Sequence, residues 1–235
     1  MIFKNCEELV SLPGFEVEKF TTSVIDLTQD LDTIWKNISK SCRYEIRRAE
    51  REGVKVRTSD DWNELYSMYR SFARAKGSGG GWAEMGRENL TQYLRNGTLF
   101  TAEFDDHILN GHLYFQDERH MRLIIAPSRR FEREEFSTAC PSSLVGHANR
   151  LTVWEAIKYA KNAGMAIFDM GGIYTGNDQT DPKYRINQFK FEFGGKLTTV
   201  YHYYMDRSRV LKVVKRVKRF ANAMLGNAVG SEKPA

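Results

Sequence analysis

The chain has 235 residues, of which 41% are hydrophobic and 28% are charged, a composition typical of a globular protein with a sizeable core. It contains no run of about 18 apolar residues and no long apolar N-terminal region, which argues against a membrane span and a secretory signal and favours a cytoplasmic protein. The formal net charge of +5 and the pI near 9.0 favour polyanionic partners such as nucleic acid, phosphorylated substrates or an anionic membrane surface.

The three cysteines are Cys6, Cys42 and Cys140, and they lie far apart in the chain. An odd number at such spacing is typical of reduced thiols packed as small apolar side chains, and it argues against a disulfide framework or a zinc site. The histidines also show no spacing typical of metal ligands. We therefore expect no metal centre.

The N-terminal part of the chain predicts a strand followed by a long helix. Apolar and threonine residues over 17–27 favour the strand, and Asp30 is placed to cap a helix over 31–52 that ends at Gly53. The apolar residues of this helix recur at helical spacing, and its other faces are basic. Solvation of a surface helix explains these cations, and so does phosphate binding. The candidate phosphate-binding residues are Arg43, Arg47 and Arg48.

The next segment alternates short elements with a glycine-rich stretch. Residues 54–56 predict a short strand, and residues 59–76 predict an amphipathic helix. Four glycines over 77–81 disfavour regular structure, so this stretch is either a lid over a substrate or a flexible connection. A helix over 84–95 follows.

From Thr98 onward the pattern changes to strands. Apolar residues with turn residues between them predict an antiparallel meander of about three strands over 98–128. The segment 129–149 has no regular period, whereas residues 150–164 regain helical spacing and end at a glycine. An apolar strand then leads into the sequence FDMGGI at 168–173. This order of elements is that of an α/β or α+β enzyme, with a sheet flanked by helices.

The C-terminal part predicts a short helix that contains the sequence FKFEF, a last strand over 196–205 and a basic helix. In the segment 206–226, apolar residues lie along one side of a helix, and lysines and arginines lie on the other. Such a helix packs on the protein with a solvated face, or it binds an anionic membrane surface or RNA phosphate. Residues 227–235 are expected to form a loose tail.

Two side chains beside these motifs are candidates for chemistry. Asp169 ends an apolar run and is followed closely by Gly171 and Gly172. Its carboxylate either holds an attacking amine and helps to remove its proton, or caps the loop by accepting hydrogen bonds from the glycine amides. Lys190 lies between phenylalanines, the first of which is Phe189, and a cation in apolar surroundings suits the stabilisation of an oxyanion. We take Asp169 and Lys190 as candidate catalytic residues. Gly171, Gly172 and Phe189 are candidate substrate-binding residues.

Other candidates for anion binding precede these motifs. His147 and Asn149 come just before the helix predicted to begin near Arg150, and free amides at a helix N-terminus favour a phosphate or an acyl oxyanion. Arg185 precedes the sequence FKFEF, where it is either a ligand of a donor phosphate or a solvated loop residue.

The order of these motifs resembles a known family. The sequence HANRLTVWEAIKYAKNAGMAIFDMGGI, followed by FKFEFGG, looks like the Fem family of peptidoglycan-bridge aminoacyltransferases, and the basic segment ending in IRRAEREGVKV is similar to that family's early region. The resemblance covers most of 30–200. It implies the GNAT acyltransferase fold, with a mixed, mostly antiparallel central sheet flanked by helices. The well-known Fem enzymes contain two GNAT-like domains, whereas at 235 residues this chain is expected to hold one, over 1–205.

The resemblance further implies an activity. Family members transfer an amino acid from aminoacyl-tRNA to an amine of a cell-wall peptide precursor without a metal or prosthetic group, and the lysine of the FK pair, here Lys190, assists the transfer. We therefore expect a cytoplasmic N-acyltransferase, peripheral to the inner membrane face if its acceptor is lipid-linked. A homodimer that rebuilds a two-domain cleft is a further expectation.

Two alternative functions stay open. The glycine-rich loop by which many GNAT enzymes bind coenzyme A is not found, and PSSLVGHANR stands in the corresponding place. This argues against acyl-CoA as the donor but leaves acyl-CoA-dependent N-acylation of a small amine or sugar as the first alternative. A non-catalytic adaptor that binds RNA or a membrane through the basic helices is the second.

Overall fold

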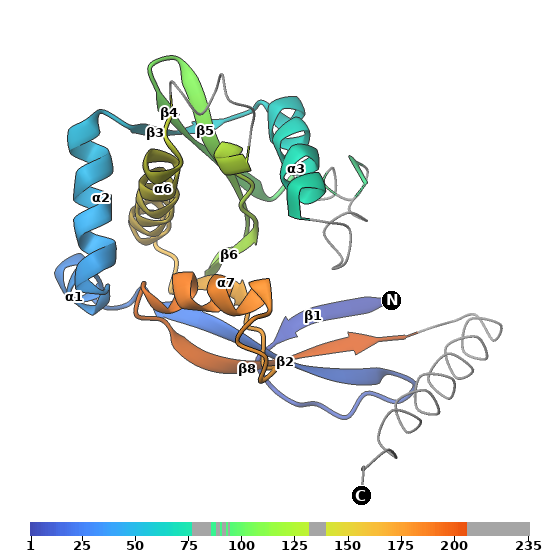
Figure 1. Cartoon of the computed structure of the whole chain (residues 1–235). Coiled ribbons are helices and arrows are strands. Elements are labelled where there is room, and N and C mark those ends of the chain that lie inside the picture. Colours follow the sequence, from blue (N-terminus) through green and yellow to red (C-terminus); the bar gives the residue numbers. More distant parts are fainter. Residues whose placement is uncertain (77–85, 88–89, 91–92, 94, 132–139, 206–235) are drawn as a thin grey trace, which may run out of the picture. The chain divides into compact units, whose positions relative to one another are not determined.

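The computed structural model describes residues 1–76, 86–87, 90, 93, 95–131 and 140–205 (Figure 1). Several predicted segments lie outside the described residues. These are the glycine-rich stretch at 77–81, most of the helix at 84–95, the basic helix at 206–226 and the tail at 227–235.

The described chain contains strands and helices in mixed order. The strands are β1 (Ile2–Cys6), β2 (Glu16–Asp26), β3 (Lys55–Ser59), β4 (Gly97–Phe104), β5 (His107–Gln116), β6 (His120–Ile125), β7 (Ile167–Gly172) and β8 (Lys196–Tyr204). The helices are α1 (Leu31–Asn37), α2 (Lys40–Glu52), α3 (Trp62–Lys76), the 3-10 turn η1 (Arg129–Phe131), α6 (Ser142–Asn162) and α7 (Pro182–Phe191).

Most of these elements agree with the sequence prediction. The strand predicted over 17–27 is β2, the meander is β4 to β6, and the short helix with FKFEF is α7. Asp30 caps α1 by accepting a hydrogen bond from the Thr33 amide at 2.8 Å, and Gly53 ends α2 in the left-handed conformation. Strand β1 was not predicted.

The structure corrects two helix boundaries. The single helix predicted over 31–52 is two helices, because Ile38 is extended and Ser39 begins α2 by accepting a hydrogen bond from the Cys42 amide at 3.2 Å. Helix α6 begins at Ser142, not near Arg150. Its first two turns contain serines, a glycine and a histidine, which hide the apolar period on which the prediction rests.

The chain divides into two compact units, one formed by Met1–Phe20 with Thr199–Ala235 and the other by Thr21–Thr198. In the first unit the strand order is β1-β8-β2, and β1 is antiparallel to β8. The Phe20 ring stacks on the His202 ring there, with centroids 4.1 Å apart. The second unit contains every described candidate residue of the site.

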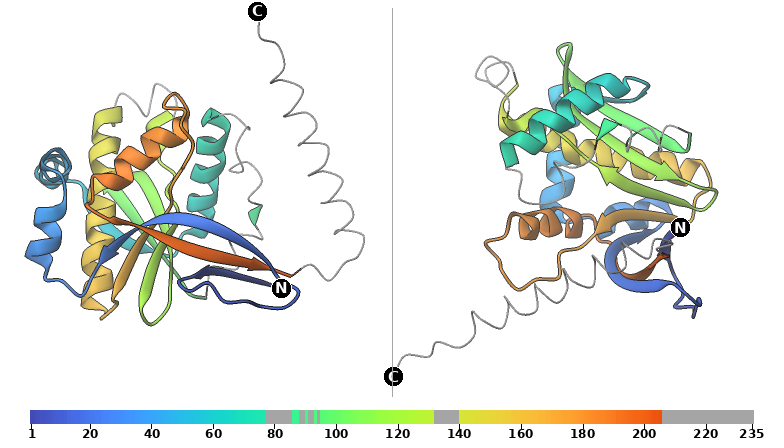
Figure 2. Two further views of the ribbon diagram at one scale, coloured as in Figure 1. Left: turned by 90° about the horizontal axis from the view of Figure 1, so that it is seen from below. Right: turned by 90° about the vertical axis from the view of Figure 1, so that its right-hand side faces the viewer.

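In the larger unit the strand order continues as β2-β7-β6-β5-β4-β3. Neighbouring strands in this series are antiparallel except β6 and β7, which are parallel. This parallel pair is joined by α6, the crossover helix that such a connection needs (Figures 1 and 2).

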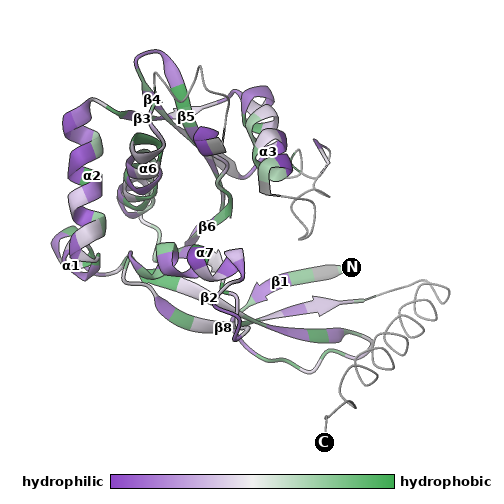
Figure 3. Cartoon of the chain, in the orientation of Figure 1, coloured by the Kyte–Doolittle hydropathy of each residue, from purple (hydrophilic) through white to green (hydrophobic). Residues whose placement is uncertain are grey.

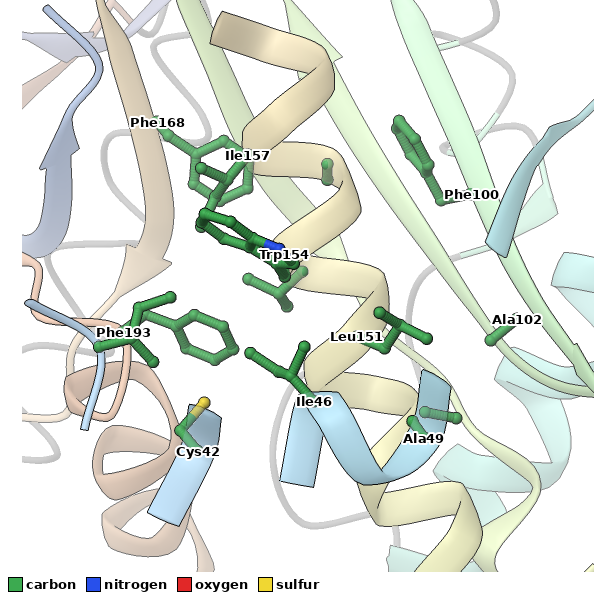
Figure 4. Close-up of a cluster of buried hydrophobic side chains, with 14 of the residues drawn as sticks. Cys42, Ile46, Ala49, Phe100, Ala102, Leu151, Trp154, Ile157, Phe168 and Phe193 are labelled. Carbon is green, nitrogen blue, oxygen red and sulfur yellow. The ribbon is translucent and has the colours of Figure 1, made fainter. Parts of the chain in front are cut away.

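Helix α6 packs on one face of this sheet, and α2 packs on α6 (Figure 4). The core between them is fully apolar at its centre and includes Cys42, Ile46, Ala49, Phe100, Ala102, Leu151, Trp154, Ile157, Phe168 and Phe193. Hydrophilic residues predominate along α2 away from this contact (Figure 3). Only one apolar stripe of α2 is buried against α6, and its arginines therefore remain at the surface.

Helix α3 covers the opposite face of the meander. Gly111 makes this close approach possible, since a Cβ atom there would lie 3.0 Å from the Leu65 side chain. Leu65, Leu99, Leu113 and Ile125 form the buried cluster beneath α3. None of the described helices combines the length and the apolar character needed to cross a bilayer.

Candidate active site

The two parallel strands separate before they end. Their register contains three pairs, of which Arg122 with Asp169 is the last. Strand β6 continues to Ile125 along β5, with a register shift next to Leu123, and β7 continues to Gly172 along β2. Beyond that pair, Leu123 and Ile125 are in register with β5 and Gly172 is in register with β2, and the register does not join the ends of β6 and β7 to each other. We take the space between these two strand ends as the candidate place for a substrate.

An ion pair lies at the point of separation. The Arg122 guanidinium donates a hydrogen bond to Asp169 Oδ2, and the exposed fractions of the two side chains are 17% and 9%. The other carboxylate oxygen, Oδ1, accepts hydrogen bonds from the Thr22 hydroxyl and from the Gly171 amide, the latter at 2.7 Å. Both oxygens of Asp169 are thus engaged by donors from three strands.

Lys190 joins this group from α7. Its side chain is buried, and its Nζ donates a hydrogen bond to the Gly172 carbonyl oxygen at 2.7 Å. Burial lowers the pKa of Lys190 to about 8, Asp169 opposes that shift and Arg122 adds to it. A pKa near 8 still leaves the amine mostly protonated at pH 7. The site therefore holds a buried cation at the end of β7, as the sequence predicts for FKFEF.

Helix α7 is fixed on the same strand end by Asn187. This buried side chain accepts a hydrogen bond from the Tyr174 amide at 3.0 Å and donates one to the Tyr174 carbonyl oxygen at 2.7 Å. Residues three apart lie on one face of a helix, so the contact that anchors Asn187 also directs Lys190 toward β7.

The two glycine pairs have different roles in positioning the site. Gly171 has a φ of 82°, and a Cβ atom there would lie 3.2 Å from the Leu123 carbonyl oxygen and 3.5 Å from Lys190 Nζ. Gly194 has a φ of 73°, and a Cβ atom there would clash with the Asn37 carbonyl group. The first pair lets the chain pass close to Lys190, and the second lets the end of α7 pack against α1.

The arrangement bears on the two interpretations of Asp169. As the loop-cap interpretation expects, the carboxylate accepts a hydrogen bond from the Gly171 amide. The hydrogen bonds from Thr22 and Arg122 occupy it further, so that binding an amine requires the carboxylate to exchange a donor. The catalytic role of Asp169 stays a prediction, and its structural role in joining β2, β6 and β7 is observed.

The reason given for His147 and Asn149 is wrong. Both lie inside α6, five or more residues after its start at Ser142, so the first-turn amides are not beside them. His147 Nδ1 lies 3.3 Å from a Glu52 carboxylate oxygen, and Asn149 Oδ1 lies 3.0 Å from His112 Nε2. Neither contact involves Asp169 or Lys190.

The remaining candidate residues lie apart from this cluster in their described contacts. The Arg47 guanidinium stacks 5.3 Å from the Trp35 ring centroid, and Arg48 pairs with Glu52 at 2.8 Å. Phe189 packs against the core. Arg43 is half-buried on α2, and Arg185 is exposed on α7.

Arg150 is a structural residue that the sequence prediction missed. Its guanidinium pairs with Glu45 of α2 at 3.1 Å and with Glu192 at the end of α7 at 2.8 Å, and it stacks on the Phe189 ring at 5.4 Å. It therefore ties α6, α2 and α7 together. Arg122 and Thr22 were also missed, since only the strand register brings them to Asp169.

Two surface hollows and the free cysteines lie outside the cluster of Arg122, Asp169 and Lys190. The hollows, of about 340 and 510 Å³, lie along β3 and α6, and neither is lined by a candidate residue. Within the described ranges, no three His, Cys, Asp or Glu side chains are grouped to hold a metal ion. Cys6, Cys42 and Cys140 are free thiols, and burial raises the pKa of Cys42 to about 12.

A family model agrees with this architecture. The acetyltransferase (GNAT) domain model matches residues 36–184, which is more than half of the chain. The chain therefore belongs to the GNAT acetyltransferase domain family. The class that the fold and family define is a GNAT-type acyltransferase, and this confirms the predicted fold class, a mixed and mostly antiparallel sheet flanked by helices.

Solved structures with this fold include FemX, a domain of a putative lysylphosphatidylglycerol synthetase and L-PGS. The crystal structure of FemX is 14% identical with a TM-score of 0.62, over 86% of this chain and 68% of that one. The C-terminal domain of a putative lysylphosphatidylglycerol synthetase from Agrobacterium fabrum is 12% identical with a TM-score of 0.55, over 82% and 62%. L-PGS from Bacillus licheniformis is 15% identical with a TM-score of 0.53, over 88% and 67%.

These likenesses show the fold alone. The chain spans about two thirds of the length of FemX and of L-PGS, and less than two thirds of the length of the Agrobacterium domain. No curated protein matches the chain. The substrates of the chain are therefore a matter for proposal.

Proposed function

We propose that the chain is an aminoacyltransferase that transfers an amino acid from aminoacyl-tRNA to an amine, such as that of a cell-wall peptide precursor. The observation that carries the proposal is the buried Lys190 ammonium at the end of β7, where β6 and β7 separate. The GNAT-type domain supports N-acyl transfer, and the resemblance to the Fem family and the fold of FemX support an aminoacyl donor.

A second group of similar structures supports the same donor class. One of them is named for lysylphosphatidylglycerol, a lipid that carries a lysyl group. A lipid-linked acceptor at the inner membrane face is therefore part of the proposal. The new bond distinguishes the two products: a wall-peptide amine gives an amide, whereas a lipid hydroxyl gives an ester.

The proposed reaction is the aminolysis of an ester. The acceptor nitrogen attacks the carbonyl carbon of the aminoacyl ester, and the carbonyl oxygen becomes an oxyanion. When this intermediate collapses, an amide N–C bond has formed, the C–O bond to the tRNA ribose has broken, and the amine proton ends on the ribose oxygen. Proximity and oxyanion stabilisation are the two contributions that the protein must supply.

Lys190 is the group proposed to stabilise the oxyanion. Its ammonium is shielded from water and is held at the Gly172 carbonyl, so that a substrate oxygen placed between β6 and β7 meets a preoriented cation. Loss of one such donor typically costs about two to three orders of magnitude in rate.

Helix α2 is proposed to bind the phosphates of the donor. Arg43, Arg47 and Arg48 lie on its outer faces, and long-range attraction to tRNA does not require them to touch Lys190. Arg48 is partly neutralised by Glu52, so Arg47 and Arg43 are expected to contribute more.

One observation favours acyl-CoA as a second candidate donor. Helix α6 is 21 residues long, and its N-cap residue, Pro141, has no side-chain oxygen to cap the amides of the first turn. The N-terminus of a long helix is a suitable site for a pyrophosphate group. N-acylation of a small amine or sugar is the reaction that this donor would serve.

Both donors are tested in one experiment. The protein is incubated with a mixture of charged tRNAs or with acetyl-CoA, each with a wall-peptide precursor, a lipid acceptor or a small amine, and products are identified by mass spectrometry. We expect an added amino-acid mass with the charged tRNAs. An acetyl mass alone supports the second donor. Binding of tRNA or anionic vesicles without any transfer contradicts both enzymatic proposals and supports the adaptor.

A further inference from the structure

Asp169 has two neighbouring cations but pairs with one of them. The Arg122 guanidinium contacts Oδ2, whereas the Lys190 ammonium donates its hydrogen bond to the Gly172 carbonyl oxygen instead. Lys190 and Asp169 form no ion pair within 4 Å, although the charge of Asp169 acts on Lys190. The question is what keeps a buried ammonium from the nearest carboxylate.

The strand register answers this question. Arg122 and Asp169 are opposite each other in the last pair of the parallel strands, so the guanidinium is delivered to the carboxylate by the backbone. The Thr22 hydroxyl and the Gly171 amide take the other oxygen. Three of the roughly four acceptor positions of the carboxylate are thus occupied, which limits its capacity to take Lys190 as well.

We propose that Arg122 is a positioning residue for acyl transfer: by engaging the Asp169 carboxylate, it leaves the Lys190 ammonium directed to the backbone at the end of β7. This inference rests on the function proposed above. Arg122 itself need not touch the substrate. Its effect is to keep the cation available for an oxyanion instead of neutralised by Asp169.

The electrostatics are consistent with this geometry. In the part of the chain that the structure describes, the charged groups that act on Lys190 are Asp169 from β7 and Arg122 from β6, and the nearby side chain from β2, Thr22, is neutral. Burial lowers the pKa of Lys190 most, and Arg122 lowers it further while Asp169 raises it. Removal of the Arg122 charge therefore raises the pKa of Lys190 and draws its ammonium toward Asp169.

The test measures Lys190 directly. Protein labelled with ¹³C-lysine is titrated by NMR, the Lys190 signal is assigned by its loss in Lys190→Met, and Arg122→Gln is compared with the unsubstituted protein. We expect the pKa of Lys190 to rise in Arg122→Gln toward its ordinary 10.5. Turnover should fall by about tenfold with little change in the donor KM, and the loss of activity at alkaline pH should move to higher pH.

Arg129→Gln is the matched control, because Arg129 makes a similarly half-buried pair with Glu64 away from the site. It should leave the pKa of Lys190 and the turnover unchanged. Arg122→Lys keeps the charge without the planar fork, so it should show a smaller shift than Arg122→Gln, and it carries the test if the latter does not fold.

An unchanged Lys190 pKa and an unchanged pH profile in folded Arg122 variants would overturn the inference. Failure of the proposed function is a separate result. It would be shown by a pKa of Lys190 that responds to Arg122 together with a lack of transfer from every donor by the unsubstituted protein. In that case Arg122 still controls Lys190, but the substrate assignment is wrong.

Discussion

The larger unit contains two buried polar clusters that differ in charge. The site cluster joins Arg122, Asp169 and Lys190 at the separation of β6 and β7. The second cluster lies between β5 and α6 and is neutral. It contains Asn110, His112, Tyr114, Asn149 and Thr152.

The neutral cluster is explained by packing. His112 is fully buried, burial lowers its pKa to about 4, and burial raises the pKa of Tyr114. Two contacts hold it together: His112 Nε2 lies 3.0 Å from Asn149 Oδ1, and the Thr152 hydroxyl lies 3.1 Å from Asn110 Oδ1, whereas Asn110 Nδ2 is buried without a hydrogen-bond partner among the described residues. Such a cluster fixes α6 on β5 without a buried charge.

The site cluster keeps a net charge that packing alone does not require. A buried ammonium lowers the stability of the fold, so a folded protein that retains one has a use for it or a compensating interaction. Asp169 is already engaged by Arg122, and this leaves Lys190 as the group to test for function. Burial of a polar residue is therefore a weak sign of a site, whereas a buried charge whose nearby carboxylate is paired with another residue is a stronger one.

Replacement of Lys190 should have the largest effect. Lys190→Met removes the cation but preserves an unbranched side chain of similar length, so turnover should fall at least about a hundredfold while the protein stays folded. Steady-state kinetics and circular dichroism measure the two properties. Lys196→Met, which removes an exposed lysine at the start of β8, is the control and should have nearly unchanged turnover.

Lys190 should also give the protein a stability that rises with pH. Its pKa is about 8 when folded and ordinarily 10.5, so the unfolded chain binds more protons between these values. The free energy of unfolding attributable to Lys190 should therefore increase over this window by up to about 3 kcal/mol. Denaturant unfolding of the unsubstituted protein and of Lys190→Met at pH 8 and pH 10 measures the difference. An equal change in both proteins would contradict the shifted pKa.

The neutral cluster should respond to pH in a different window. The pKa of His112 is lowered from 6.5 to about 4, so its contribution to stability is complete above pH 6.5 and is lost as the pH falls toward 4. The loss should reach up to about 3 kcal/mol. The same unfolding measurement on His112→Gln at pH 7 and pH 4.5 should show a smaller decrease than in the unsubstituted protein. Equal decreases would mean that His112 is not the group that titrates.

The smallest expected effect is that of Thr152→Val. The hydroxyl has one proton to share between Asn110 Oδ1 and the Ala148 carbonyl oxygen, and its loss leaves a buried acceptor without that donor. Stability should fall by about 1–2 kcal/mol, and turnover should be unchanged because the residue lies in the neutral cluster. A loss of turnover at unchanged stability would break the distinction between the two clusters.

The sequence predicted the elements and the lysine better than the contacts between them. Lys190 could be selected because a cation between phenylalanines is visible in the chain itself. Arg122 could not, because a single arginine in the strand HMRLII acquires its role only when the parallel register places it opposite Asp169. A contact across strands is set by register, and register depends on the whole sheet.

Helix boundaries failed for local reasons. Ser39 interrupts a continuous apolar period by capping α2, and the start of α6 contains exposed serines and a glycine beside the buried Leu144 and Val145. His147 and Asn149 were therefore assigned to a helix terminus when they lie inside α6. In both cases a few polar or small residues conceal the helix boundary in the apolar period.

Substrate is proposed to bind where β6 and β7 separate, beside Lys190. Hydrogen–deuterium exchange tests this binding site in the presence of desulfo-coenzyme A or of a stable amide analogue of the aminoacyl-tRNA 3′ end. We expect slower exchange at residues 123–125 and 171–172 with at least one of these probes. Protection confined to the hollows along β3 and α6, with no change at the separated strand ends, would contradict it.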